Sequence, residues 1–116
     1  QRQRYTDARQ VLVAAIARPM LSPEQAIEVG YALGCVHAAL GRDVRLAAKE
    51  RRSELRDAES VFADVIAADP RHFRAHHGRA AALEALDLAE QADAAYRTCI
   101  SIEPRYAPCW IGLGQM

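Results

Sequence analysis

The sequence has few features that would support catalysis or insertion into a membrane. It contains no apolar run of roughly 18 residues, the length that a membrane-spanning helix requires, and no signal peptide is visible. It also lacks a G-x-S-x-G elbow, a glycine-rich phosphate loop and an H-E-x-x-H motif. We therefore expect no membrane insertion, no enzymatic activity, no catalytic residues and no cofactor.

Neither the net charge nor the cysteine pattern points to a particular kind of ligand. Acidic and basic residues balance at 15 each, so no net field favours nucleic acid. The bases are almost all arginine, with Lys49 the only lysine, which indicates a GC-rich, bacterial genome. Cys35, Cys99 and Cys109 are odd in number and form no C-x-x-C pair, which argues against a disulfide framework and against zinc. We predict reduced, buried cysteines and a cytoplasmic location.

The residues that are present favour helices. Alanine is abundant, glycine and proline number only six and five, and strand-type alternation of Val, Ile and Thr is absent. A chain of 116 residues makes one domain at most. It starts without Met and stops inside a helical pattern, so we expect a piece of a longer chain. The composition predicts an all-α domain.

A pattern recurs at a fixed spacing in the second half of the chain. Ala58, Phe62 and Pro70 form a first set, and Ala92, Tyr96 and Pro104 form a second set of similar residues. Each residue of the second set follows its counterpart in the first by the same number of residues, which is the repeat period. The string 110–114 then reads W-x-x-L-G. On these residues the chain resembles the tetratricopeptide repeat (TPR) family of helix–turn–helix units. The resemblance implies a right-handed superhelical solenoid of antiparallel helix pairs, which we expect over residues 1–116.

The resemblance divides the chain into one helix, two pairs and the start of a third pair. We predict the second helix of a repeat at 5–18, ended by Pro19, then a pair at 23–68, a pair at 72–102 and a further start at 106–116. Ser22 and Gln25 have the spacing of a capping box, and Leu33-Gly34 matches the first helix of a repeat, where the glycine admits its partner helix closely.

The pair at 23–68 is about a dozen residues too long for one repeat. The surplus falls near 48–54, in a stretch that has no apolar residue between Lys49 and Glu54. We predict that 43–68 is one long helix whose polar middle projects into solvent. The alternative is two helices broken near Ser53.

Two slots in the first helix of the pair at 72–102 depart from the family pattern. His76 and Arg79 stand where the family has Trp and Leu, and these departures are where we would look first for function. His72 and His76 are four residues apart, with His77 adjacent, as in metal-ligating pairs. No third ligand lies at a convincing spacing, so we predict no metal site and a partly buried His76.

The family resemblance implies that a peptide or protein partner binds in the concave groove lined by the first helix of each pair. The slots that would face this groove are Glu28, Tyr31, Cys35, Arg74, His77, Ala81, Glu84, Ile111 and Gln115. The Lys and Asn with which some members clamp a carboxylate terminus are replaced here, so that activity is not expected. The predicted function is a protein-interaction module or scaffold; the alternative is a regulatory or substrate-presenting arm of a larger enzyme, such as a glycosyl- or sulfotransferase.

Two further surfaces stand out in the sequence. A basic stripe, spaced by three and four residues, runs beside an acidic stripe, and we interpret the two as a solvated helix face. The basic residues are Arg42, Arg45, Lys49, Arg52 and Arg56, and the acidic ones are Glu50, Glu54 and Asp57. The last helix leaves Trp110, Ile111 and Leu113 without a following helix, so we predict a homodimer through this end, or fraying there.

Overall fold

The computed structural model describes residues 2–16 and 21–116, and all regular structure in these residues is α-helical. The expected all-α class is therefore confirmed. The helices are α1 (Arg2–Ile16), α2 (Pro23–Gly41), α3 (Ala48–Ala68), α4 (Phe73–Ala85), α5 (Ala89–Ile102) and α6 (Ala107–Gly114). None of the helices in the described residues combines the length and the apolar character needed to cross a membrane.

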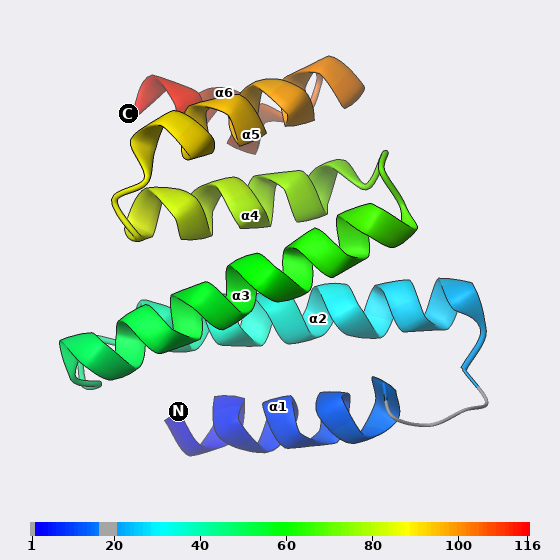
Figure 1. The fold of residues 1–116 in the computed structure, drawn as a ribbon, viewed down its shortest axis with the longest axis vertical. Helices are drawn as coiled ribbons and strands as arrows, with labels where there is room; N and C mark the ends of the chain where they lie inside the picture. The colour runs from blue at the N-terminus through cyan, green and yellow to red at the C-terminus, as the bar shows by residue number, and fades with distance from the viewer. Residues whose placement is uncertain (1, 17–20) are drawn as a thin grey trace.

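The helices stack in chain order, from α1 at one end to α6 at the other (Figure 1). Each helix packs against its neighbours in the chain, and the backbones of α2 and α4, and of α4 and α6, also come within 8 Å of each other. No such approach joins α1, α3 and α5 within the described ranges. The even-numbered helices therefore form the closer-spaced layer of a slab that measures 36 × 35 × 19 Å.

Local sequence signals place most helix boundaries correctly. The capping box at Ser22 is present: its hydroxyl accepts from the backbone N–H of Gln25 (3.1 Å), and the Gln25 side chain accepts from the backbone N–H of Ser22 (3.0 Å). Pro23 occupies the first turn of α2, as Pro108 does in α6. Helix α1 begins at Arg2, before the predicted start at Tyr5, and its predicted end at Arg18 and Pro19 lies outside the described residues.

The prediction of one continuous helix over 43–68 is wrong, and so is the alternative break near Ser53. Residues 42–47 form a loop, and α3 runs unbroken from Ala48 through Ser53. The Asp43 carboxylate accepts from the backbone N–H of Arg45 (3.0 Å) and from its guanidinium, an arrangement that competes with helix formation. Leu46 is buried and fixes the loop to the body of the fold. The surplus residues thus divide between a loop and the first turns of α3.

The later boundaries differ only slightly from the predictions. Helix α4 starts at Phe73, next to the predicted 72, and α5 ends at Ile102, where the predicted pair ends. The intervening turn has no glycine, and Asp87 takes the left-handed conformation instead, with φ of 65°. Aspartate tolerates this region better than most residues, because its short side chain bonds locally.

The repeat period of the sequence recurs in the structure as repeated contacts at the turns. The backbone N–H of Asp69 donates to the carbonyl of Val65 (2.8 Å), and that of Glu103 donates to the carbonyl of Cys99 (2.9 Å). Asp69 and Glu103 have nearly the same backbone conformation, with φ and ψ of −140° and 88° in one and −138° and 89° in the other. The turn before α4 and the turn before α6 are therefore copies of one another.

The two cores repeat in the same way. Phe62 lies against Gly78, where an added Cβ would come within 2.6 Å of the ring, and Tyr96 lies against Gly112, where it would come within 2.4 Å. Phe62 also packs on Gly34 from the other side, at 2.5 Å from a Cβ built there. Each large ring on an odd-numbered helix therefore fits only because a glycine on an even-numbered helix provides the space.

The cysteine prediction is wrong in two respects. Cys99 and Cys109 form a disulfide between α5 and α6, with Cα atoms 6.3 Å apart, and Cys35 is a free cysteine that is exposed. Cys99 and Cys109 are each fully buried. They stand one repeat period after Val65 and Ala75, which share one core cluster, so the repeat places these two positions close together.

Candidate functional site

His76 and Arg79, the two positions that depart from the repeat pattern, both make contacts within the fold. The ring Nε2 of His76 donates to the carbonyl of Pro70 (2.9 Å), and one repeat period later the indole Nε1 of Trp110 donates to the carbonyl of Pro104 (2.8 Å). His76 is thus a buried substitute for tryptophan, as predicted. Arg79 donates to Glu59 of α3 (2.9 Å) and forms an ion pair between helices.

The three neighbouring histidines point to separate partners. His72 is the N-cap of α4, where its Nδ1 accepts from the backbone N–H of Ala75 (3.1 Å). His76 bonds to the Pro70 carbonyl, and His77 lies half-buried between the rings of Tyr96 and Tyr106. The spacing of His72 and His76 therefore reflects a helix cap and a core contact.

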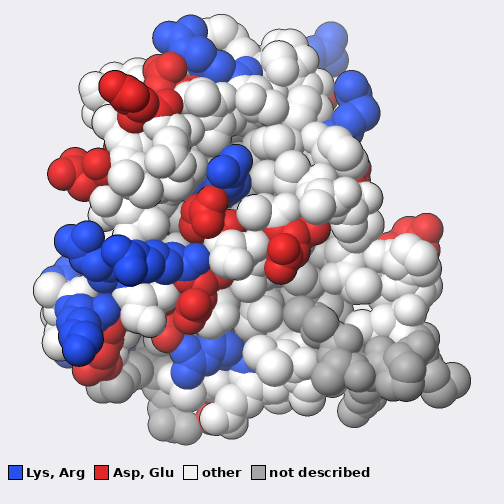
Figure 2. Space-filling model, in the orientation of Figure 1, with Lys and Arg blue, Asp and Glu red and all other residues white. Residues whose placement is uncertain are grey.

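The interpretation of the charged stripes holds only in part. Arg42 and Arg45 lie in the loop before α3, so the basic residues do not form one helical stripe. Lys49, Arg52 and Arg56 are exposed on α3. Figure 2 shows one face of the molecule, on which Lys and Arg side chains gather at the left edge, near the start of α3, with Asp and Glu side chains beside them.

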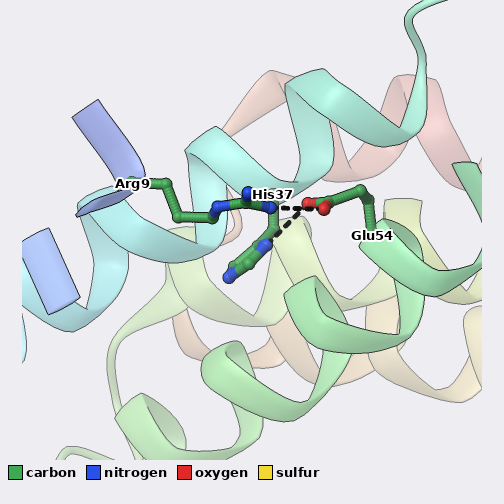
Figure 3. A network of polar contacts seen from close by, with 3 residues as sticks. All are labelled: Arg9, His37 and Glu54. Carbon is green, nitrogen blue, oxygen red and sulfur yellow. Dashed lines mark hydrogen bonds and ion pairs between the residues drawn. The ribbon is translucent and has the colours of Figure 1, made fainter. Parts of the chain in front are cut away.

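Glu54 is a clear exception to a solvated face. It forms an ion pair with Arg9 of α1, and its second oxygen accepts from Nδ1 of His37 on α2 (2.8 Å; Figure 3). The predicted free projection of 48–54 is therefore wrong, because this residue ties three helices together. Asp57 lies nearby, so that His37, Glu54 and Asp57 offer donor atoms within 4.8 Å of one another. The Glu54 carboxylate already has a cationic partner, the guanidinium of Arg9.

The even-numbered helices carry a cluster of aromatic, basic and sulfur-containing side chains, here called the Tyr31–Tyr106 cluster. Its members are Tyr31, Cys35, Arg42, His72, Arg74, His77 and Tyr106. The rings of Tyr31 and His72 are 5.0 Å apart, and those of His77 and Tyr106 are 5.8 Å apart. The Arg74 guanidinium lies over the Tyr106 ring at 5.8 Å. This geometry suits cation–π contact.

Burial shifts the pKa values of three side chains in this cluster. Burial, followed by the nearby Cys35, raises the pKa of Tyr31 to about 12. Burial also raises the pKa of the Cys35 thiol, although part of this residue is exposed. For His77, burial lowers the pKa of the imidazole, and the positive charge on Arg42 lowers it further. The phenol and the thiol are therefore neutral at pH 7, and the imidazole is neutral as well.

The structure brings four of the nine predicted groove residues together, namely Tyr31, Cys35, Arg74 and His77. Glu84 instead accepts from the hydroxyl of Tyr96 (2.7 Å). Of the other four, Ala81 is partly buried, and Glu28, Ile111 and Gln115 are exposed.

Arg42, His72 and Tyr106 belong to the cluster but are not among the predicted groove residues. A signal for two of them was present, because Tyr106 follows His72 by one repeat period and both are N-caps of even-numbered helices. Arg42 follows the end of α2, in a loop whose path was mistaken for helix. Its approach to Cys35 and His77 depends on that loop.

A separate cavity of about 440 Å³ lies between α2 and α3. Gly30 lines it and contributes no side chain; it occupies the position on α2 that corresponds to His76 on α4 and Trp110 on α6. Among the described residues that line it, most are apolar and Asp64 alone is charged. No residue of the Tyr31–Tyr106 cluster lines this cavity.

Comparison of the chain with protein-family models, curated proteins and solved structures finds no match.

Proposed function

We propose that this chain is a TPR-type helical repeat domain that binds a protein or peptide partner across its even-numbered helices. Two observations support the architecture: contacts at the turns and cores recur with the period of the sequence, and the even-numbered helices are the closer-spaced layer. A stack whose helices are closer on one face bends toward that face. The even-numbered face is then the concave one.

The observation that carries the proposal is the Tyr31–Tyr106 cluster. It spans α2, α4 and the start of α6, and its aromatic rings and arginines are the residue types that are enriched at protein interfaces. Arg42 and Arg74 are the charged members, so the cluster is cationic at pH 7 while His77 stays neutral. A partner segment that carries carboxylates next to apolar side chains complements it.

Selection from a random peptide library tests this function. Peptides enriched on the wild-type chain should carry acidic and apolar residues, and should lose at least about tenfold in affinity for Arg74→Glu, since a reversed charge repels the carboxylates. The double variant Tyr31→Ala, His77→Ala should lose binding through the lost ring contacts. Circular dichroism must show that each variant remains folded.

Val44→Ala provides the matched control, because this side chain is 82% exposed in the loop before α3. It should bind the selected peptides as the wild type does. Peptides that bind Arg74→Glu and the double variant with wild-type affinity would show that the partner uses another surface, and the proposed function would be wrong.

A further inference from the structure

Three arginines line a hollow at one edge of the fold, where α2 and α4 end and α3 begins (Figure 1). Arg42 directly follows α2, and Arg51 and Arg52 lie in the first turns of α3. The hollow has a volume of about 360 Å³, and none of the described residues that line it is acidic. All charged side chains described in its wall are therefore positive. This hollow is called here the arginine pocket.

The carboxylates of this part of the fold are bound to other cations. Their ion pairs are Asp43–Arg45, Glu54–Arg9, Glu54–His37 and Glu59–Arg79. Glu50, in the first turn of α3, lines a different hollow against α1. None of the ion pairs between described residues includes Arg42, Arg51 or Arg52. The arginine pocket thus collects three positive charges that no described carboxylate neutralises.

Arg51 contributes a buried donor that lacks an acceptor. Its Nε is the one buried side-chain nitrogen or oxygen of the described residues without a hydrogen-bond partner. Burying an N–H group in this way destabilises a fold, and native structures contain few such groups. Leu55 and Leu86 also line the pocket, and in such partly apolar surroundings opposite charges attract more strongly than in water. An anion bound in the pocket would give this donor an acceptor.

The start of α3 adds backbone donors to the same pocket. Ala48, the first residue of this 21-residue helix, lines the pocket, and no side chain caps this end of the helix. The first N–H groups of a helix have no acceptor within the helix, and the helix dipole favours a negative charge beside them. These backbone groups therefore reinforce the positive field of the arginines.

We infer that the arginine pocket binds a phosphate group carried by a small molecule. A guanidinium pairs with two phosphate oxygens at once, and a phosphate or diphosphate has enough oxygens for several such donors, whereas a carboxylate has only two. The volume lies within the range of small-molecule sites, and Leu55 and Leu86 suit an attached organic group. Arg42 also belongs to the Tyr31–Tyr106 cluster, but this inference does not depend on the peptide-binding proposal.

Nitrogen-15 NMR of the wild-type chain tests the inference without any substitution that could disturb the fold. Inorganic pyrophosphate should shift the Nε–Hε signal of Arg51 and the backbone amide signal of Ala48, because hydrogen bonds to the anion form at these groups. The signal of Arg51 is assigned by its disappearance in Arg51→Lys. The inference is wrong if this signal stays unchanged at about 10 mM pyrophosphate, a concentration above the usual range of affinities between enzymes and their substrates.

Isothermal titration calorimetry with pyrophosphate compares two double variants that lose the same charge. Arg51→Gln with Arg52→Gln should weaken binding at least about tenfold, since two guanidinium contacts are lost. The control Arg71→Gln with Arg105→Gln removes two exposed arginines in the turns before α4 and α6, and it should bind as the wild type does. Both are measured at about 150 mM salt, which screens distant charges. Equal weakening in the two variants would mean general attraction to positive charge, and the inference would be wrong.

Two further titrations identify what carries the phosphate group. A nucleoside diphosphate should bind more tightly than pyrophosphate, because its organic part adds contacts with the apolar wall of the pocket. A phosphoserine peptide that binds more tightly than the nucleoside diphosphate would assign the phosphate to a protein partner and would overturn the small-molecule assignment. Circular dichroism must show that each variant used in these comparisons is folded.

Discussion

The Phe62 core and the Tyr96 core occupy corresponding places in the chain, yet they are closed by different chemistry. Phe62 lies between two glycines, Gly34 and Gly78, and its surroundings are apolar. Tyr96 lies against a single glycine, Gly112, and donates its hydroxyl to Glu84 (2.7 Å). Val65 and Ala75 of the first core are replaced by the Cys99–Cys109 disulfide in the second.

The difference follows from what surrounds each core. The Phe62 core has packed helices on both sides, and its buried residues close it through apolar contacts. The Tyr96 core ends at the short α6, which contacts only α5 and α4 among the described helices. A covalent bond and a hydrogen bond there add to the apolar contacts of the second core. One packing scheme is thus closed by apolar contacts around Phe62, and by apolar contacts together with cross-links around Tyr96.

The largest expected effect comes from truncating the apolar core. Phe62→Ala should lower the free energy of unfolding by about 3–5 kcal/mol, because it leaves a cavity between two helices that cannot close over it. Tyr96→Phe should cost only about 1 kcal/mol, since the ring stays and one hydrogen bond is lost. Urea denaturation followed by circular dichroism measures both, with Val44→Ala as a neutral control. Equal losses in Phe62→Ala and Tyr96→Phe would contradict the comparison.

The disulfide should contribute the next largest effect. The double variant Cys99→Val, Cys109→Ala installs the residue pair of the first core, so that packing is kept and only the covalent link is lost. The bond closes a loop with a sequence separation of 10. Its loss should lower the free energy of unfolding by about 3 kcal/mol on the loop-entropy model. A reducing agent should destabilise the wild type similarly and leave the variant unchanged; a wild type indifferent to reduction would mean that this link does not support α6.

Glycine substitutions should separate the covered positions from the open one. Gly112→Ala should cost about 1–3 kcal/mol, because its methyl group would enter the Tyr96 ring, and Gly78→Ala should behave alike against Phe62. Gly114→Ala should instead leave stability unchanged or raise it by up to about 1 kcal/mol, since alanine favours a helix and the site is open. Thermal and urea melts at low protein concentration check this, and a loss at Gly114 as large as at Gly112 would contradict it.

The smallest effect concerns pH and His77. Burial and Arg42 lower the pKa of His77 in the folded state below its usual 6.5. The unfolded chain therefore takes up a proton first as the pH falls, so the stability contributed by neutral His77 is complete above about pH 6.5 and declines below it. Between pH 7 and 5, urea denaturation should show a larger loss for the wild type than for His77→Gln. Parallel pH profiles would show that His77 is solvated.

Much of the fold could be predicted because its signals are local or periodic. Ser22, Gln25 and Pro23 specify the start of α2 through contacts within one turn. The equal spacing of Phe62 from Tyr96 and of Pro70 from Pro104 predicts repeated helix pairs, because identical spacings allow identical contacts. The loop at 42–47 was missed because helix propensity is a weak signal that the Asp43–Arg45 bonds and the burial of Leu46 override.

The sequence by itself determined the helical class, the repeat period and four of the residues in the Tyr31–Tyr106 cluster. Only the tertiary structure decided which side chains meet: Cys99 with Cys109, Glu54 with Arg9 and His37, and Tyr31 with His72. Such contacts join side chains from different helices or from a loop, so they depend on the packing of whole elements. A period in the sequence fixes which positions correspond, whereas packing decides which of them touch.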